Sequence, residues 1–156
     1  MRFLVDRMLG RLARWLRIVG YDAVYFNQPF SRTITMTSLA EHRIIITRNS
    51  RVSARRSYRL ILIHSDHLSD QLHQLIDACG IQIRADRFFS RCSFCNMPVK
   101  TVDRHSIRNH VPAFVYATSS HFSQCPSCGR IFWQGTHNNL IKQQLSAMGI
   151  SYEDTH

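Results

Sequence analysis

The sequence predicts an α/β fold with a parallel sheet, followed by a small module built on four cysteines. Three observations favour this organisation. Strand-like and helix-like segments alternate over residues 1–87, which is typical of a parallel sheet covered by helices. The apolar runs at 43–47 and 59–64 are nearly continuous, as in strands that are buried on both faces. From residue 88 the pattern changes to paired cysteines and aromatic residues with little helical periodicity.

The expected strands of the first part are short apolar runs, found at residues 2–5, 22–26, 43–47 and 59–64. The expected helices follow the strands, at residues 9–19, 37–42, 50–57 and 69–80. Gly20 and Gly80 stand where the first and last of these helices should end, and Ser69 is a candidate N-cap. Active sites of such sheets form at the carboxyl ends of the strands.

We predict an α/β domain over residues 1–87, a cysteine module over 88–150 and a disordered tail over 151–156. The chain carries 20 Lys+Arg against 10 Asp+Glu, and 18 of the 20 are arginine. The α/β part holds 14 of these arginines and seven acids. Most of the positive charge is therefore expected on the first domain.

Arginine binds phosphate in a bidentate manner and stacks on bases, so nucleic acid is the first partner to consider, ahead of an anionic membrane. The alternative is that the charge only keeps the protein soluble. No apolar stretch is long enough to span a membrane, and none resembles a signal peptide. We therefore expect a protein of a reducing compartment, the cytoplasm, where paired cysteines indicate metal binding rather than disulfides.

Two CxxC pairs are the most specific motif of the chain, and 29 residues separate them. Two residues between thiolates allow one turn to direct both sulfurs at one ion, and two such turns complete a tetrahedral Zn²⁺ site. The alternative is two unlinked pairs of buried or redox-active cysteines. The interval must hold an additional hairpin or helix, and Cys79 is expected to be an ordinary core residue. The predicted structural zinc ligands are Cys92, Cys95, Cys125 and Cys128.

Acidic residues are few, and Asp6 and Asp66 are the best placed for catalysis. Asp6 follows the first strand, but an N-cap of the next helix would explain it equally well. A metal-dependent nuclease needs several carboxylates around Mg²⁺ or Mn²⁺. After the third strand Asn49 stands where an acid is expected, and residues 27–40 contain no acid. Glu41 and Asp22 are the further acids that an active site would have to recruit.

Arginines of the first helix recur at helical spacing opposite its leucines, so we expect one exposed stripe along it. A second basic stretch follows the third strand and includes a tyrosine that can stack on a base. A solvated surface helix is the simpler alternative. The candidate nucleic-acid-binding residues, which become candidate RNA contacts through the resemblance described next, are Arg7, Arg11, Arg14, Arg17, Arg48, Arg51, Arg55, Arg56, Tyr58 and Arg59.

Five segments in this order resemble the Mut7-C RNase domain family: FLVDRMLGRLARWLRIVGYDAVY, RIIITRNSR, RFFSRCSFC, VPAFVYA and CPSCGRIFWQGTH. The resemblance runs from residue 2 to about residue 140. It implies a PIN-like three-layer α/β/α sandwich, a C-terminal four-cysteine zinc ribbon and metal-dependent ribonuclease activity. It also implies that Asp6 matches the first-strand aspartate of the family, and that Asn49 replaces the aspartate of its TRD motif.

Since the expected acids are largely missing, the favoured hypothesis is an RNA-binding protein on a ribonuclease scaffold, with ribosomal or tRNA-like structured RNA as its partner. The second hypothesis is an active Mg²⁺- or Mn²⁺-dependent ribonuclease that uses Asp6 and Asp66. The third is a module that docks on a protein partner through its zinc ribbon.

Overall fold

The computed structural model describes residues 1–28, 32–52, 54–133 and 135–154, apart from the side chains of Arg32, Arg55 and Thr136. The strands are β1 (Arg2–Asp6), β2 (Asp22–Phe26), β3 (Ile44–Thr47), β4 (Arg59–Leu62), β5 (Lys100–Val102), β6 (Phe122–Gln124) and β7 (Ile131–Trp133). The α-helices are α1 (Gly10–Ile18), α2 (Arg32–Glu41), α3 (Leu68–Cys79), α4 (Ala113–Thr118) and α5 (Thr136–Ala147). Short 3-10 helices are η1 (Arg7–Leu9), η2 (Ala54–Arg56), η3 (Ala85–Arg87) and η4 (His105–Ile107).

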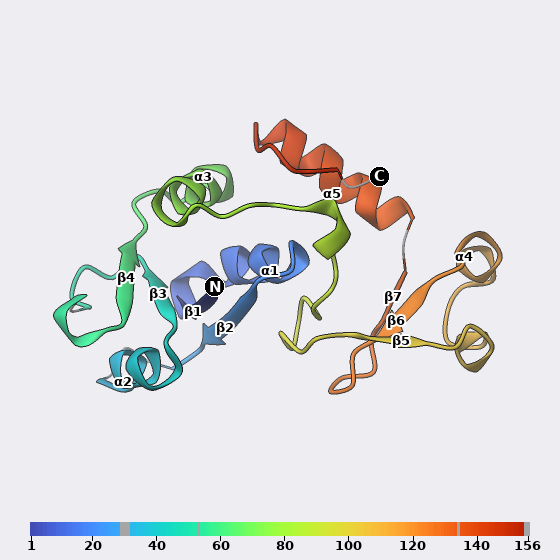
Figure 1. Cartoon of the computed structure of the whole chain (residues 1–156), viewed down its shortest axis with the longest axis horizontal. Helices are drawn as coiled ribbons and strands as arrows, with labels where there is room; N and C mark the ends of the chain where they lie inside the picture. The colour runs from blue at the N-terminus through green and yellow to red at the C-terminus, as the bar shows by residue number, and fades with distance from the viewer. Residues whose placement is uncertain (29–31, 53, 134, 155–156) are drawn as a thin grey trace.

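Strands β1 to β4 form one parallel sheet in the order β2-β1-β3-β4, and β5 to β7 form a separate antiparallel sheet (Figure 1). The predicted α/β fold with a parallel sheet is confirmed. The interval between the cysteine pairs holds β5, η4, α4 and β6, so of the predicted hairpin or helix a helix, α4, is present. None of the described helices combines the length and apolarity that crossing a bilayer requires.

The parallel sheet is covered on both faces, because alternate residues of its central strands point to opposite sides. Phe3 and Val5 of β1 belong to a large core that also contains residues of α1 and α3. Leu4 of the same strand packs on the other face with Ile34 of α2 and Ile45 of β3. The resulting arrangement has three layers, helix on sheet on helix, which explains the nearly continuous apolar strands.

The large core does not end at the predicted boundary after residue 87. Helix α5 follows β7 and packs back on the α/β part on the side of α1 and α3 (Figure 1), where Ile141 and Leu145 are buried in the same core as Phe3. Ile150 joins them after the helix. The boundary therefore separates the two sheets, while the apolar core includes residues from both sides of it.

The predicted disordered tail is wrong for residues 151–154, which are docked on the α/β part. Glu153 exchanges two backbone hydrogen bonds with the segment before η3, one to the carbonyl of Ile83 and one from the amide of Ala85 (2.8 and 2.9 Å). Lys142 of α5 binds the Asp154 carboxylate at 2.7 Å. Backbone pairing of this kind orders a segment that its composition alone would leave unassigned.

Helix ends follow the glycine predictions but not the Ser69 prediction. Gly20 has a φ of 92°, and a Cβ there would lie 2.8 Å from the carbonyl oxygen of Arg87, so only glycine fits. Helix α3 begins one residue earlier than expected, with His67 as N-cap, and the Ser69 hydroxyl instead donates to the carbonyl of Met148 (3.2 Å). The expected helix at 50–57 is only the short turn η2, whereas α2 is longer than predicted.

Leu145→Ala should lower the free energy of unfolding by about 2–5 kcal/mol, because the side chain is fully buried in the core that α5 shares with α1 and α3. Leu140→Ala is the matched control, since Leu140 lies on the same helix and is 49% exposed. Urea denaturation of both variants measures the difference. Equal effects of the two substitutions would contradict the packing of α5 described above.

Candidate functional site

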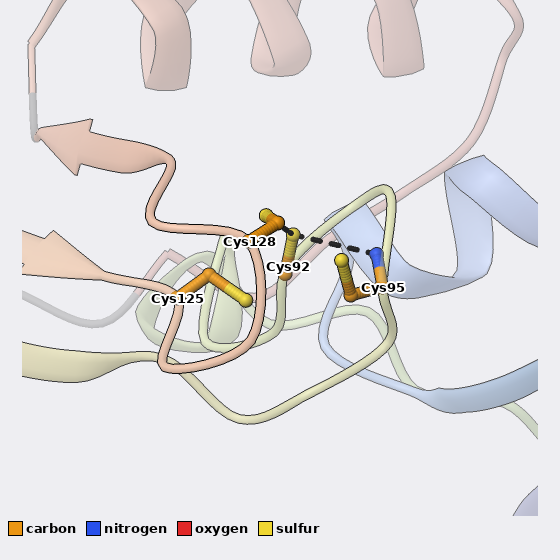
Figure 2. A group of neighbouring side chains, drawn as sticks. All are labelled: Cys92, Cys95, Cys125 and Cys128. Atoms are coloured by element: carbon orange, nitrogen blue, oxygen red, sulfur yellow. Dashed lines mark hydrogen bonds between the residues drawn. The ribbon is translucent and has the colours of Figure 1, made fainter.

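The four paired cysteines converge on one point. Cys92 and Cys95 precede β5, Cys125 and Cys128 lie between β6 and β7, and all four sulfurs lie within 4.8 Å of one another (Figure 2). The Sγ atoms of Cys92 and Cys128 are 3.7 Å apart. Metal–sulfur bonds of about 2.3 Å in a tetrahedron place sulfurs about 3.8 Å apart. The donor set and its spacing therefore fit a four-coordinate structural metal ion.

Each cysteine pair sits in a turn of the same construction, here called a knuckle (residues 92–97 and 125–130). In the first knuckle the Cys92 amide donates to the carbonyl of Met97, and the Asn96 amide donates to the carbonyl of Cys92 (2.8 and 2.9 Å). The second knuckle repeats both bonds at the same spacing. The residue after each second cysteine, Asn96 or Gly129, has a positive φ (65° and 73°). Such repeated local geometry aims both pairs of sulfurs inward.

The thiol groups differ in their affinity for protons. A backbone hydrogen bond from Arg130 is the main cause that lowers the pKa of Cys128 to about 6. The hydrogen bond between Cys95 and Cys128 in turn raises the pKa of Cys95 to about 12. Since the thiolate is the form that binds metal, an ion held by the four sulfurs would displace the protons that remain on them. Cys79 packs against the core on α3, as expected.

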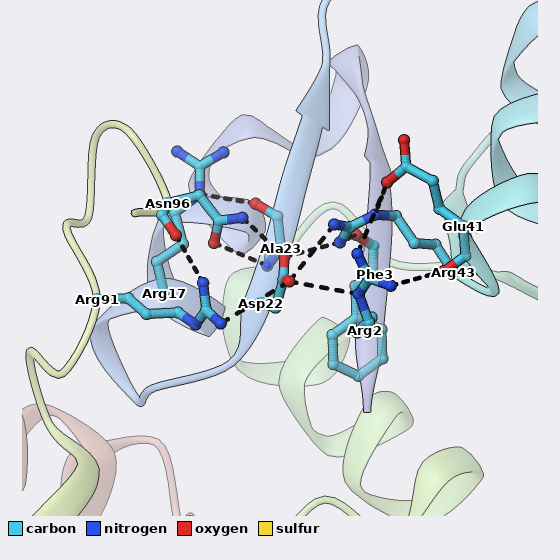
Figure 3. A network of polar contacts seen from close by, with 9 residues as sticks. All are labelled: Arg2, Phe3, Arg17, Asp22, Ala23, Glu41, Arg43, Arg91 and Asn96. Atoms are coloured by element: carbon cyan, nitrogen blue, oxygen red, sulfur yellow. Dashed lines mark hydrogen bonds and ion pairs between the residues drawn. The ribbon is translucent and has the colours of Figure 1, made fainter. Parts of the chain in front are cut away.

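The first knuckle is bonded to the free edge of the parallel sheet (Figure 3). Arg17 of α1 donates from Nε to the carbonyl of Ala23 (2.8 Å) and from Nη1 to the carbonyls of Phe94 (2.7 Å) and Ser93 (3.3 Å). The Asn96 side chain accepts a bond from the Ala23 amide (3.0 Å). Both outward-facing polar groups of Ala23 on edge strand β2 are thereby satisfied, and the knuckle occupies the place of a further strand.

The predicted arginine stripe is therefore wrong at Arg17. This side chain is 8% exposed, whereas Arg7, Arg11 and Arg14 are exposed. The helical wheel predicts an outward position, but the first knuckle packs over that face of α1. Arg17 holds the two parts of the chain together and is not available to RNA.

Asp22 and Glu41, the further acids considered for catalysis, lie at the amino ends of the strands, whereas Asp6 lies at the carboxyl ends. Asp22 begins β2 and pairs in register with Arg2, whereas Asp6 ends β1. Its carboxylate accepts hydrogen bonds from Arg43 and Asn96 (2.7 and 2.8 Å). Burial acts to raise the pKa of Asp22, but these bonds hold it below its usual range. Glu41 also binds Arg43 (2.5 Å), so both acids stabilise the fold.

Asp6 lies at the carboxyl edge of the sheet, as predicted, but it does not cap a helix. It makes no side-chain cap bond to the following turn η1. Its carboxylate is 8% exposed and accepts a 2.6 Å hydrogen bond from the hydroxyl of Thr47, the last residue of the neighbouring strand β3. Thr47 in turn accepts a bond from the amide of Asn49 (2.9 Å). Asp6 is thus tied to the strand end where the second acid was expected.

The other candidate ligands at this edge have partners of their own. Asn49 accepts a bond from the amide of Arg51 (3.0 Å) and closes a local turn. Asp66 is 72% exposed and forms an ion pair with Arg48. Within the part of the chain that the structure describes, only the four cysteines form a group of three or more metal-ligating side chains.

The remaining candidate RNA contacts lie in segments near the two opposite ends of the strands of the parallel sheet. Arg7, Arg11, Arg51 and Arg56 are exposed on or after the segments that leave the carboxyl ends of β1 and β3, and none is in an ion pair among the described residues.

Near the other end of the strands, Tyr58 packs edge-on against His42 and Arg59 donates to the carbonyl of Ala78. The side chain of Arg55, also a candidate, lies outside the described residues. Arg56 of η2 is two residues before Tyr58, so the segment between β3 and β4 joins the two sets along the chain.

One feature of the surface is missed by the sequence interpretation. A cleft of about 500 Å³ lies between α1, β7 and α5, and Trp15, Phe132 and Trp133 line it. The aromatic run that follows the second knuckle could have predicted this cleft. A thin module cannot bury three consecutive large apolar residues of a short strand, so some of them must line its surface.

The family model of the Mut7-C RNAse domain matches residues 1–145. The chain belongs to the Mut7-C RNAse domain family. The match confirms the resemblance seen in the sequence and extends into α5, so this Mut7-C domain includes both sheets and all four cysteines. No curated protein and no solved structure matches the chain.

Cys125→Ser should remove the bound metal from this Mut7-C domain and lower its melting temperature, because three sulfurs no longer complete the shell. Elemental analysis of the purified protein is expected to find about one metal ion per wild-type chain. Cys79→Ser is the control and should keep the ion. Equal metal content in both variants would contradict the four-thiolate site.

Arg17→Ala should lower the free energy of unfolding of the Mut7-C domain by about 2–4 kcal/mol, because it leaves carbonyls of Ala23 and Phe94 without their donor. Arg14→Ala, on the exposed side of the same helix, should cost less than about 1 kcal/mol. Chemical denaturation with metal present compares the two. A neutral Arg17→Ala would show that the knuckle is not held through this side chain.

Proposed function

We propose that this Mut7-C domain is an RNA-binding protein that retains a PIN-like scaffold but has little or no ribonuclease activity. The observation that carries the proposal is the state of the carboxyl edge, where Asp6 is bonded to Thr47 and Asp66 is paired with Arg48. A divalent ion needs several free anionic oxygens, and Asn49 adds none. Family membership supports a relation to RNA and to nucleases.

Positive charge replaces the missing acids at this edge. Arg7 and Arg11 follow Asp6 in the chain, and Arg51 follows Asn49 by two residues. All three are exposed and have no carboxylate partner among the described residues. Guanidinium groups without internal partners favour phosphate as a ligand. The edge is therefore better suited to holding the backbone of RNA than to binding a catalytic cation.

We infer further that the cysteine cluster is a zinc ribbon and that its role is structural. Four thiolates in a closed shell favour Zn²⁺ over Mg²⁺ or Mn²⁺. The ion would fix the knuckle that binds α1 and β2, and so would position the arginines of α1. Structured RNA, ribosomal or tRNA-like, in the cytoplasm is the proposed partner, and a protein contact through the ribbon is the lesser alternative.

Replacing an unpaired arginine should weaken RNA binding, whereas replacing a paired one should not. Arg7→Gln and Arg11→Gln should each reduce the slope of log affinity against log salt by about 1. Arg84→Gln is the control with the same change in charge, because Arg84 is neutralised by Asp86 and Glu153. Fluorescence anisotropy of a labelled structured RNA over a range of salt concentrations gives the slopes. Salt-independent binding would contradict phosphate recognition.

A cleavage assay on the same RNA separates binding from catalysis. We expect no Mn²⁺- or Mg²⁺-dependent cleavage by the wild-type protein above the level of Asp6→Ala. Asn49→Asp supplies an acid that can keep the bond to the Arg51 amide, so it should increase the affinity for Mn²⁺. Cleavage by the wild-type protein that Asp6→Ala abolishes would establish the nuclease alternative instead.

A further inference from the structure

The cleft between α1, β7 and α5 combines aromatic faces with unpaired arginines. Its aromatic lining comes from elements far apart in the sequence: Trp15 from α1, and Phe132 and Trp133 from β7. All three side chains are half-buried. Ring contacts hold two of them in place, since Phe132 stacks on Phe89 (6.0 Å between centroids) and Trp133 packs on His137 (5.1 Å). The cleft is thus a preformed aromatic surface.

Positive charge is concentrated beside these rings. Phe94 lies next to the guanidinium groups of both Arg130 and Arg14, at 3.8 and 4.7 Å from its centroid. Arg11 is a further lining residue. None of the three arginines is in an ion pair among the described residues, and no described acid lines the cleft. Two like charges held on one ring favour an anion that neutralises them.

We propose that this cleft binds an unpaired base of RNA and its phosphate; the proposal rests on the RNA binding proposed above and names the part of RNA that is held. A base offers a planar face to Trp15 and Trp133, and its phosphate pairs with Arg14 and Arg130. The volume of about 500 Å³ lies within the range of sites for small ligands. Other occupants fit the cleft less well. An acyl chain would leave the arginines without an anionic partner, and an acidic peptide would leave the aromatic faces without a stacking partner.

Two arginines of α1, Arg11 and Arg14, line the cleft, and Arg7 lies four residues before Arg11 in the chain. Arg7, Arg11 and Arg14 recur along η1 and α1 at spacings of four and three residues, so they cover about 10 Å of helix. Arg7 directly follows Asp6, and Arg14 lines the cleft. A single strand that follows this stripe leads from the carboxyl edge of the sheet to the aromatic lining.

Both tryptophans of the chain lie in the cleft, so intrinsic fluorescence reports its occupancy directly. The experiment titrates the 156-residue chain with a labelled single-stranded RNA of mixed sequence, and separately with the same strand in a blunt duplex. Tryptophan quenching and anisotropy of the label are measured together. We expect single-stranded RNA to quench the tryptophans and to bind at least fivefold more tightly than the duplex.

Phe94→Ala is the informative variant, because it removes the ring between the arginines and keeps the carbonyl that Arg17 binds. It should weaken single-strand binding by about 5-fold or more. Phe114→Ala on α4 is the control, since that phenylalanine is 74% exposed and does not line the cleft. Circular dichroism and metal content establish that both variants are folded.

Three results would overturn the proposal. If RNA binds by anisotropy but leaves the tryptophans unquenched, the cleft is not the site, and the proposed RNA binding stands. If polyglutamate quenches as strongly as RNA, the arginines recognise charge alone. If neither form of RNA binds at about 50 mM salt, the proposed function itself fails. Loss of quenching in Phe94→Ala with retention in Phe114→Ala supports the cleft.

Discussion

The bonding of the first cysteine knuckle to edge strand β2 is the contact on which the relation between the two sheets depends. Asn96 and Arg17 satisfy both outward-facing backbone groups of Ala23. Because Asn96 adopts a left-handed conformation that the knuckle requires, its side chain reaches the sheet only when the knuckle is formed. Metal binding, the edge of the parallel sheet and the position of α1 are therefore coupled through a few hydrogen bonds.

The same coupling explains how the candidate sites relate to one another. Phe94 stands beside the metal ligands, its carbonyl is bound by Arg17, and its ring contacts Arg14 and Arg130. The cysteine cluster therefore fixes the position of Phe94, and through it the positions of the arginines that face the proposed ligand. In the proposed function, the sheet edge where a metal-dependent nuclease would concentrate negative charge presents arginines instead.

The parallel sheet and the four-cysteine cluster could be predicted from the sequence, because both depend on local patterns: apolar periodicity and the spacing of the CxxC pairs. The burial of Arg17 could not be predicted, since a helical wheel contains no information on the segment 76 residues away that packs over that face. The cap predicted at Ser69 and the cap considered as an alternative at Asp6 are wrong for the same reason. Each of them bonds to a distant partner, Thr47 and Met148, where local rules favour a cap. The aromatic cleft could not be predicted either, because it forms only where α1, β7 and α5 come together.

The return of α5 to the first sheet has a consequence for biosynthesis. Phe3 near the beginning of the chain shares a core with Leu145 and Ile150, and contacts of such large sequence separation form late in folding. While the chain is being translated, the α/β layer lacks part of its apolar cover until α5 has left the ribosome. Vectorial synthesis thus leaves part of the apolar core beside α1 and α3 exposed until α5 packs on it.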